Sequence, residues 1–286
     1  MAQTFAQMKA RGTQVIEGRL HRRKGGGLSF LMGGDGDPLL LLHGVPGSAQ
    51  TWTKTGSKLG GRFRVIIPDL AGFGASAPSA DGFYVEEQAQ AVRALLAHLQ
   101  ITDLYLGGHG FGGAVALTLM RLFPELGVRG LVLSATNVLT DTLLPASLRL
   151  AKLPGLNRLF FWATAGNRLG LRMLYESALQ NKEETTWREF RRHLTPRSVA
   201  QTGAILRHTL VNRKPGDQAL EELLPTIRCP ALVLWGDEDP FLTSAVGEQM
   251  AATLPHAVFK LYAYTGHFVP EERPLETAED ILLRFE

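Results

Sequence analysis

A short apolar strand leads directly into a glycine-rich turn and then into a helix, and this feature constrains the fold of the chain more than any other. The run is Leu104-Tyr105-Leu106-Gly107-Gly108-His109-Gly110-Phe111-Gly112, and an Ala/Leu-rich stretch follows it over residues 114–123. A turn this sharp needs small residues on both sides, because the helix packs close to the strand. Gly108 and Gly112 fill those two places. The sequence therefore predicts a strand–turn–helix unit of an α/β sheet.

The turn has the spacing of the G-x-S-x-G nucleophile elbow, which lifts its central residue above the sheet as a nucleophile. In this chain the central residue is Gly110, which has no side chain. The elbow is thus predicted without its nucleophile.

Strand and helix patterns alternate on both sides of the elbow. Short stretches rich in apolar residues predict buried strands at 39–42, 63–67, 128–133 and 231–234, of which 39–42 is wholly apolar, and helical spacing predicts helices over 85–99, 244–254 and 275–285. This alternation implies a mostly parallel central sheet flanked by helices. From residue 139 to about 226 the pattern is helical, with no convincing strand. We therefore expect a core made of residues 1–137 and 227–286, and a helical lid inserted over residues 138–226.

Three further segments are expected at the edge of the sheet where the elbow lies, because each follows a predicted strand. The loop His43-Gly44-Val45-Pro46 can turn the backbone N–H of Val45 toward the elbow, and with the N–H of Phe111 it would form an oxyanion hole. Three carboxylates follow a late strand in Asp237-Glu238-Asp239-Pro240, and His267 follows the next strand. The order of nucleophile position, acid and histidine is the one expected for such an elbow.

Together these segments resemble the α/β-hydrolase superfamily over essentially the whole chain. The resemblance implies that the acid is Asp239, the carboxylate immediately before proline, and that His267 is the general base. His43 and His109 are expected to be scaffold residues beside the loops. Candidate substrate contacts in the lid are Phe160, Trp162 and Tyr175, although Phe160 and Trp162 are also expected in the core of the lid.

The loop His43–Pro46, with Trp52 downstream, resembles the epoxide-hydrolase, dehalogenase and carbon–carbon-bond-hydrolase side of the superfamily. Phe111 stands where dehalogenases usually carry a halide-binding tryptophan, and Tyr175 is the only obvious ring-opening acid, where epoxide hydrolases use two tyrosines. The residual expectation is a serine-type hydrolase acting on a hydrophobic ester, lactone or ketone.

Gly110 leaves several interpretations open, because it permits neither an acyl-enzyme nor an alkyl-enzyme. The residue has replaced the nucleophile of a working hydrolase, or the chain is a natural enzyme in which His267 and Asp239 activate water or abstract a substrate proton. A third interpretation is a ligand-binding pseudoenzyme that has lost turnover. A fourth interpretation is a chaperone-like or scaffold protein, and no feature of the sequence supports it.

The composition limits the kinds of partner that the chain is expected to bind. The 286-residue chain has a net charge of +3 and a single cysteine, Cys229. One compact basic run, His21-Arg22-Arg23-Lys24, is expected to be the solvated turn of an N-terminal hairpin and not a nucleic-acid patch. The chain has no apolar run long enough for a membrane span and no apparent signal peptide. We expect a cytoplasmic protein that acts on a small hydrophobic molecule and uses neither a metal nor an organic cofactor. The oligomeric state is left open.

Overall fold

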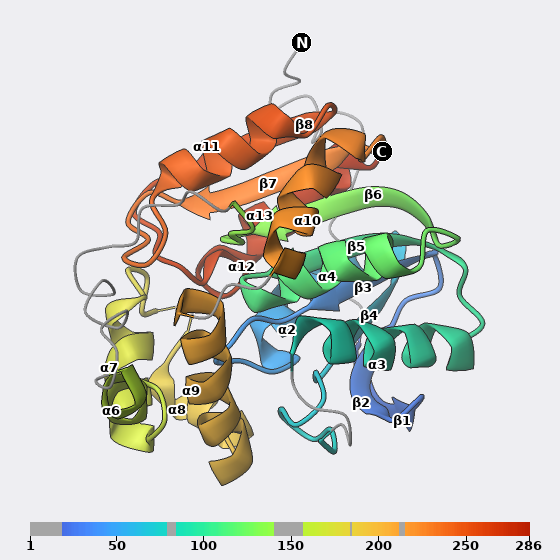
Figure 1. The fold of residues 1–286 in the computed structure, drawn as a ribbon. Helices are drawn as coiled ribbons and strands as arrows, with labels where there is room; N and C mark the ends of the chain where they lie inside the picture. The colour runs from blue at the N-terminus through green and yellow to red at the C-terminus, as the bar shows by residue number, and fades with distance from the viewer. Residues whose placement is uncertain (1–18, 79–83, 140–156, 184, 212–214) are drawn as a thin grey trace.

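The computed structural model describes residues 19–78, 84–139, 157–183, 185–211 and 215–286, and an eight-stranded sheet runs through the centre of the molecule (Figure 1). The strands are β1 (His21–Gly25), β2 (Leu28–Gly33), β3 (Asp37–Leu42), β4 (Phe63–Pro68), β5 (Asp103–His109), β6 (Gly127–Ser134), β7 (Ala231–Gly236) and β8 (Ala257–Tyr262). Their order across the sheet is β1-β2-β4-β3-β5-β6-β7-β8. Strand β2 pairs antiparallel with β1 and β4, and the other pairs are parallel. The predicted α/β fold is confirmed.

Side chains alternate between the two faces of the sheet, so each face has its own hydrophobic core. In β3, Leu40 and Leu42 belong to one core, and Leu39 and Leu41 belong to the other. The first core packs under α3 (Val85–His98), α4 (Phe111–Leu122), α10 (Pro215–Leu223) and α11 (Ser244–Thr253). The second packs under α2 (Gln50–Leu59), α12 (Val269–Glu272) and α13 (Pro274–Arg284). Burial on both faces explains why these strands are rich in apolar residues.

The basic run near the N-terminus is not a turn, and that prediction was wrong. Residues His21–Gly25 form the edge strand β1, and the hairpin turns at Gly26 and Gly27, whose φ angles are 54° and 83°. Four of the five β1 residues are exposed, so this strand lacks the apolar signal that marks the inner strands. Arg22 nevertheless pairs with the buried Asp69, at 2.6 Å.

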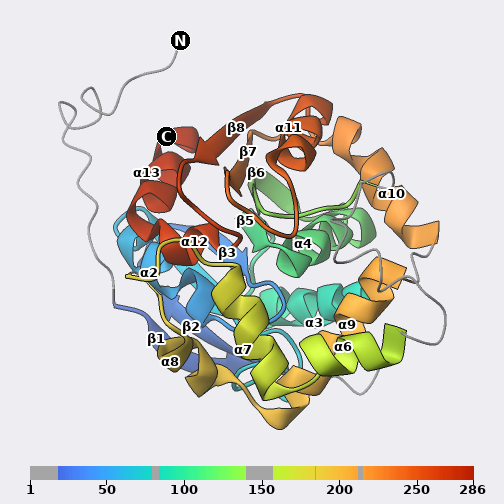
Figure 2. The same cartoon turned by 90° about the vertical axis from the view of Figure 1, so that its left-hand side faces the viewer.

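The described segment between β6 and β7 is helical. It comprises α6 (Asn157–Thr164), α7 (Arg168–Ser177), α8 (Trp187–Phe190), the 3₁₀ turn η2 (Arg191–His193), α9 (Pro196–Val211), α10 and the 3₁₀ turn η3 (Leu224–Thr226). Helices α6 to α9 lie together beyond one end of the sheet (Figures 1 and 2), and they share a small apolar cluster that includes Leu171, Phe190 and the core residue Phe268. Helix α10 instead packs against α4. The exact lid boundaries, 138–226, stay a prediction.

The described residues were also compared with the requirements of a membrane-spanning helix and of a metal site. No helix there is long and apolar enough to cross a bilayer. No three His, Cys, Asp or Glu side chains in the same ranges are grouped as metal ligands would be.

Candidate active site

The elbow between β5 and α4 is built from glycines that cannot be replaced without a clash. A Cβ atom added at Gly108 would lie 2.4 Å from the backbone of Gly112, and one added at Gly112 would lie 2.4 Å from the carbonyl oxygen of Leu42. Contacts this short require the backbone to move. The close approach of helix and strand that the sequence predicted is therefore present, and it brings α4 against the end of β3.

Gly110 is different, although it sits between these two glycines. Its φ and ψ angles are 52° and −119°, a conformation that side chains rarely adopt. A Cβ atom added here would nevertheless meet nothing closer than 3.8 Å. Its nearest neighbours would be the Cα of Gly44 and the Nε2 of His267, both at 3.8 Å, and the carbonyl oxygen of Ala135 at 3.9 Å. The elbow thus has space for a Cβ atom at position 110, at ordinary van der Waals distance from its neighbours, and His267 borders this space.

His267 and Asp239 form a hydrogen-bonded pair beside this space. The Nδ1 of His267 lies 2.7 Å from one carboxylate oxygen of Asp239. The other carboxylate oxygen accepts the backbone N–H groups of Phe241 at 2.8 Å and Leu242 at 3.1 Å, and the Asp239 side chain is fully buried. Because a carboxylate accepts here, Nδ1 carries the proton of the neutral imidazole, and the lone pair of Nε2 is free to act as a base.

The other two carboxylates of the acidic cluster do not contact His267. Asp237 accepts the backbone N–H of Thr265 at 3.2 Å, and both Asp237 and Glu238 are exposed. The structure therefore brings to the histidine the same carboxylate that the resemblance singled out.

Two further histidines hold the loops of the site. His109 lies 4.9 Å from His267 between ring centroids, and its Nε2 lies 3.0 Å from the carbonyl oxygen of His267. Burial lowers the pKa of His109 to about 3, so the ring is neutral and donates this hydrogen bond. His43 accepts the backbone N–H of Leu70 on Nε2, so its Nδ1–H donates to the carbonyl of Gly44 at 2.8 Å. Both residues have the structural surroundings expected of scaffold.

The two amides predicted for an oxyanion hole flank the same space. Phe111 is the first residue of α4, directly after Gly110, and Val45 follows Gly44, whose Cα lies 3.8 Å from the added Cβ. Neither amide donates to an acceptor among the described residues. The N-terminal end of α4 also carries partial positive charge. The oxyanion hole stays a prediction, and both of its amides are without a protein acceptor in the part of the chain that the structure describes.

Comparison with known proteins agrees with this geometry. The family model described as "alpha/beta hydrolase fold" matches residues 37–274. The chain belongs to the α/β-hydrolase family.

Relatives within this family are hydrolases of several kinds. The chain is similar to "Uncharacterized hydrolase YugF" of Bacillus subtilis, with 28% identity over 85% of this chain and 88% of that protein. It is similar to "Haloalkane dehalogenase 2" of Mycobacterium tuberculosis, with 27% identity over 94% of this chain and 95% of that one. The solved structure of a thermophilic esterase from Thermogutta terrifontis has a TM-score of 0.73 and 26% identity, and covers 92% of this chain and 97% of its own. By this resemblance the chain is an α/β-fold hydrolase.

The lid residues predicted to touch a substrate have other surroundings in this α/β hydrolase. Tyr175 is fully buried, and its hydroxyl lies 2.8 Å from Glu271 and 2.7 Å from Thr185, so it is already engaged. Trp162 is 64% exposed and so does not lie in the lid core. The side chain of Phe160 lies outside the described part of the chain.

Residues that the sequence did not single out surround the histidine instead. The ring of Phe241 lies 5.2 Å from that of His267, and Phe241 follows the Asp-Pro pair directly, which could have marked it. The Glu272 carboxylate accepts the backbone N–H of Gly266, before His267, and those of Gln180 and Asn181 from the lid segment. The N–H of His267 itself donates to Ala178 at 2.9 Å. The histidine loop and the lid segment 178–181 are therefore directly hydrogen-bonded.

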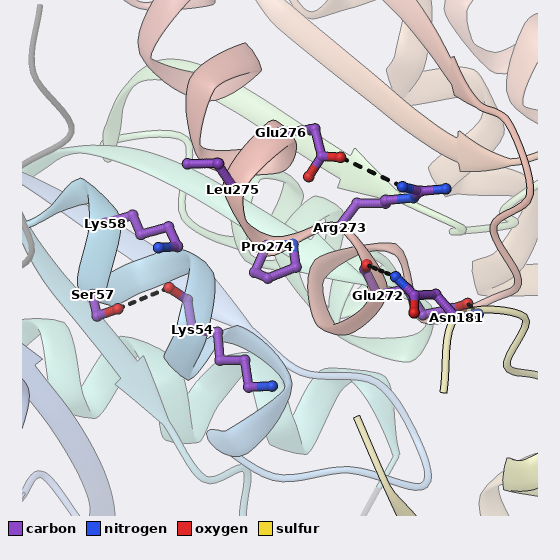
Figure 3. A pocket seen from close by; sticks show the side chains of 9 residues that line it. All are labelled: Lys54, Ser57, Lys58, Asn181, Glu272, Arg273, Pro274, Leu275 and Glu276. Carbon is purple, nitrogen blue, oxygen red and sulfur yellow. Dashed lines mark hydrogen bonds and ion pairs between the residues drawn. The ribbon is translucent and has the colours of Figure 1, made fainter. Parts of the chain in front are cut away.

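A cavity lies elsewhere, away from the elbow. It has a volume of about 460 Å³ and lies beside α2, α12 and α13 (Figure 3). Its lining is mostly charged and includes Lys54, Lys58, Glu272, Arg273 and Glu276. Arg273 and Glu276 pair across it at 3.5 Å. Gly110, Asp239 and His267 do not line it, so it is not the pocket of the site described above.

Proposed function

We propose that this chain hydrolyses a hydrophobic ester or lactone with a water molecule that the His267–Asp239 pair activates, without a covalent nucleophile. One observation carries the proposal. A Cβ atom added at Gly110 clashes with no atom, and the Nε2 of His267 lies 3.8 Å from it. A water molecule at that position would stand where other members of the family present a side-chain nucleophile.

The reaction follows from the groups at the site. Nε2 of His267 takes a proton from the water, and the resulting hydroxide attacks the ester carbonyl carbon. Asp239 accepts Nδ1–H and stabilises the imidazolium that forms. The oxyanion of the tetrahedral intermediate accepts hydrogen bonds from the amides of Val45 and Phe111. The imidazolium then returns its proton to the alkoxide as the carbon–oxygen bond breaks, which leaves a carboxylic acid and an alcohol.

The side chains beside the site favour a hydrophobic substrate. Val45, Phe111 and Phe241 are each partly exposed, as is Gly110 itself. A substrate that reached Gly110 would therefore pass apolar surface. The likeness to a solved thermophilic esterase supports an ester bond.

A second candidate function is ligand binding without turnover, and Gly110 itself favours it. Loss of the nucleophile in a serine hydrolase costs about 10⁶ in turnover, while binding and the oxyanion hole retain roughly 10³–10⁴ over water. The same geometry also fits a serine or aspartate hydrolase in which residue 110 has been replaced.

The test compares the chain that carries Gly110 with Gly110→Ser and Gly110→Asp on p-nitrophenyl esters, epoxides and haloalkanes. The proposal expects slow ester cleavage by the chain with Gly110 that is lost in His267→Ala. It expects Gly110→Ser to raise ester cleavage by on the order of 10³ or more, because a serine here would regain a covalent step.

Other results would assign the other functions. If the chain with Gly110 cleaves no ester and Gly110→Ser does, the chain is a disabled serine hydrolase. Epoxide or haloalkane turnover that appears only with Gly110→Asp would place it with the aspartate enzymes. If none of the three proteins has activity and all of them bind a hydrophobic ligand, the chain is a binder.

A further inference from the structure

We infer that the cavity beside α2, α12 and α13 binds a small polar molecule that carries a phosphate group. The inference does not depend on the reaction proposed above, because Gly110, Asp239 and His267 do not line this cavity. It assigns a ligand to a second site of the molecule, whose walls also hold the loop that carries His267.

The cavity has walls from three parts of the chain. Helix α2 contributes Lys54, Ser57 and Lys58, the lid segment contributes Asn181, and the end of α12 and start of α13 contribute residues 272–276. Its volume of about 460 Å³ lies within the range of pockets that bind small molecules, roughly 300–1,000 Å³. An organic molecule with a charged group therefore fits it.

The basic side chains of the lining favour an anion. Lys54 and Lys58 are half-buried and four residues apart on α2, so they are neighbours on the helix surface (Figure 3). Like charges at this spacing repel each other. Arg273 adds a third basic group, from the residue that joins α12 to α13. An anion held by these three groups would relieve the repulsion and accept charge-assisted hydrogen bonds.

A phosphate group suits these donors better than a carboxylate does. It has three terminal oxygens and a charge of about −1.5 to −2 at pH 7. A carboxylate has only two oxygens and a single charge. Three basic side chains therefore match a phosphate in both the number of donors and the charge.

The guanidinium of Arg273 has one nitrogen placed for such a ligand. Its Nε donates to the hydroxyl of Thr265 at 2.9 Å, and its Nη2 donates to the carbonyl oxygen of Ala263 at 2.8 Å. Its Nη1 has only Glu276 as a partner among the described residues, at 3.5 Å. This ion pair is long and the Glu276 side chain is 48% exposed, so the carboxylate is a weak competitor for Nη1.

The other acidic groups nearby do not exclude an anion. The carboxylate of Glu272 accepts the backbone N–H groups of Gly266 and of lid residues 180 and 181, which offset its negative charge. Glu279 interacts electrostatically with Lys58, but it does not line the cavity. The lining itself thus holds three basic side chains against one engaged carboxylate and one exposed carboxylate.

The cavity is connected to the loop of His267 by its own lining. Arg273 bonds this loop at Ala263 and Thr265, and Glu272 bonds it at Gly266, directly before His267. A phosphate group on Nη1 would fix the guanidinium and, with it, the loop. Ligand binding is therefore expected to slow hydrogen exchange at the amide of Gly266.

The experiment measures binding of ribose 5-phosphate by titration calorimetry, with ribose and inorganic phosphate as partial ligands. Ribose 5-phosphate is expected to bind about tenfold more tightly than ribose, because only the phosphate meets the basic groups. It is expected to bind about threefold more tightly than inorganic phosphate, because the sugar hydroxyls reach Ser57 and Asn181. Hydrogen exchange with and without ribose 5-phosphate gives the second readout.

Three variants locate the binding. Lys54→Ala and Lys58→Ala should each weaken ribose 5-phosphate about fivefold, since each removes a charge-assisted hydrogen bond. Glu276→Gln should strengthen it about threefold, since it removes the competing carboxylate from Nη1 of Arg273. The matched control is Lys24→Ala, which removes the same charge from the exposed strand β1, outside the cavity, and should leave the affinity unchanged. Thermal denaturation checks that each variant is folded.

Several results would overturn the inference. They are no binding of ribose 5-phosphate, equal affinity for ribose 5-phosphate and either partial ligand, and equal affinity of the folded Lys54→Ala, Lys58→Ala and Lys24→Ala variants. Weaker binding by Glu276→Gln, or unchanged exchange at Gly266, would also contradict it. Ester cleavage without phosphate binding would reject this inference and leave the proposed function in place, and binding without ester cleavage would do the reverse.

Discussion

The two nitrogen atoms of the His267 imidazole have different surroundings. On the Nδ1 side, Asp239 is fully buried, holds the ring at 2.7 Å and is itself held by two backbone amides. On the Nε2 side, Gly110 leaves a space with no atom closer than 3.8 Å to the position of a Cβ. The acid side is thus a hydrogen-bonded network, and on the other side Nε2 has no hydrogen-bond partner in the described part of the chain.

The contrast shows that the missing nucleophile has not disturbed its surroundings. Gly110 has a φ of 52°, which glycine adopts without strain, and Cβ atoms added at the flanking Gly108 and Gly112 would lie 2.4 Å from backbone. The close packing of α4 on β5 and β3 therefore depends on the flanking glycines.

The largest effect is expected on the acid side once a nucleophile is present. In the Gly110→Ser background, Asp239→Asn should lower ester turnover by about 10⁴, because an amide cannot hold the imidazole in the required tautomer. Steady-state kinetics on a p-nitrophenyl ester would measure this. A loss of less than tenfold, with the fold intact by circular dichroism, would mean that Asp239 does not orient His267.

The next effect separates two glycines of the same turn. Gly112→Ala should lower the free energy of unfolding by about 3 kcal/mol, since its Cβ meets the Leu42 carbonyl at 2.4 Å. Gly110→Ala should cost only about 1 kcal/mol, the strain of an alanine at positive φ. Urea denaturation of both variants measures the difference. Equal losses would show that a Cβ atom at position 110 clashes as one at position 112 does.

The smallest effect concerns Glu271, which joins α12 to the lid. Burial raises the pKa of this carboxyl above its usual value of 4.5, and its side chain bonds Tyr175 and Thr185. Because the folded state holds the proton more tightly, Glu271 stabilises the protein at low pH and loses that contribution as pH rises above about 4.5.

Glu271→Gln should therefore flatten the fall in unfolding free energy above that pH, by at most about 1.4 kcal/mol per pH unit. Urea denaturation at several pH values measures the slope. An unchanged slope would assign the pH dependence to Glu272, whose pKa is also raised by burial.

Much of the core was predictable because its signals are local. The leucines of β3 and the glycines of the elbow reflect burial on both faces and close backbone approach, and both can be read along the chain. Strand β1 was not predictable as a strand, since it is an exposed edge that carries charge. The position of Asp239 relative to His267 came from family resemblance, because 28 residues separate them and only the fold brings them together. The hydrogen bond between Tyr175 and Glu271 joins residues 96 positions apart, so no local sequence pattern could indicate it.

The central claim is that His267 and Asp239 are ready to activate a nucleophile placed above Gly110. It is tested most directly by treating the Gly110→Ser variant with a sulfonyl fluoride and locating the adduct by peptide mass spectrometry. The account predicts rapid sulfonylation at position 110, absent from the chain with Gly110 and abolished by a second substitution, His267→Ala. A folded Gly110→Ser protein that stays unmodified, or that is modified equally without His267, would contradict it.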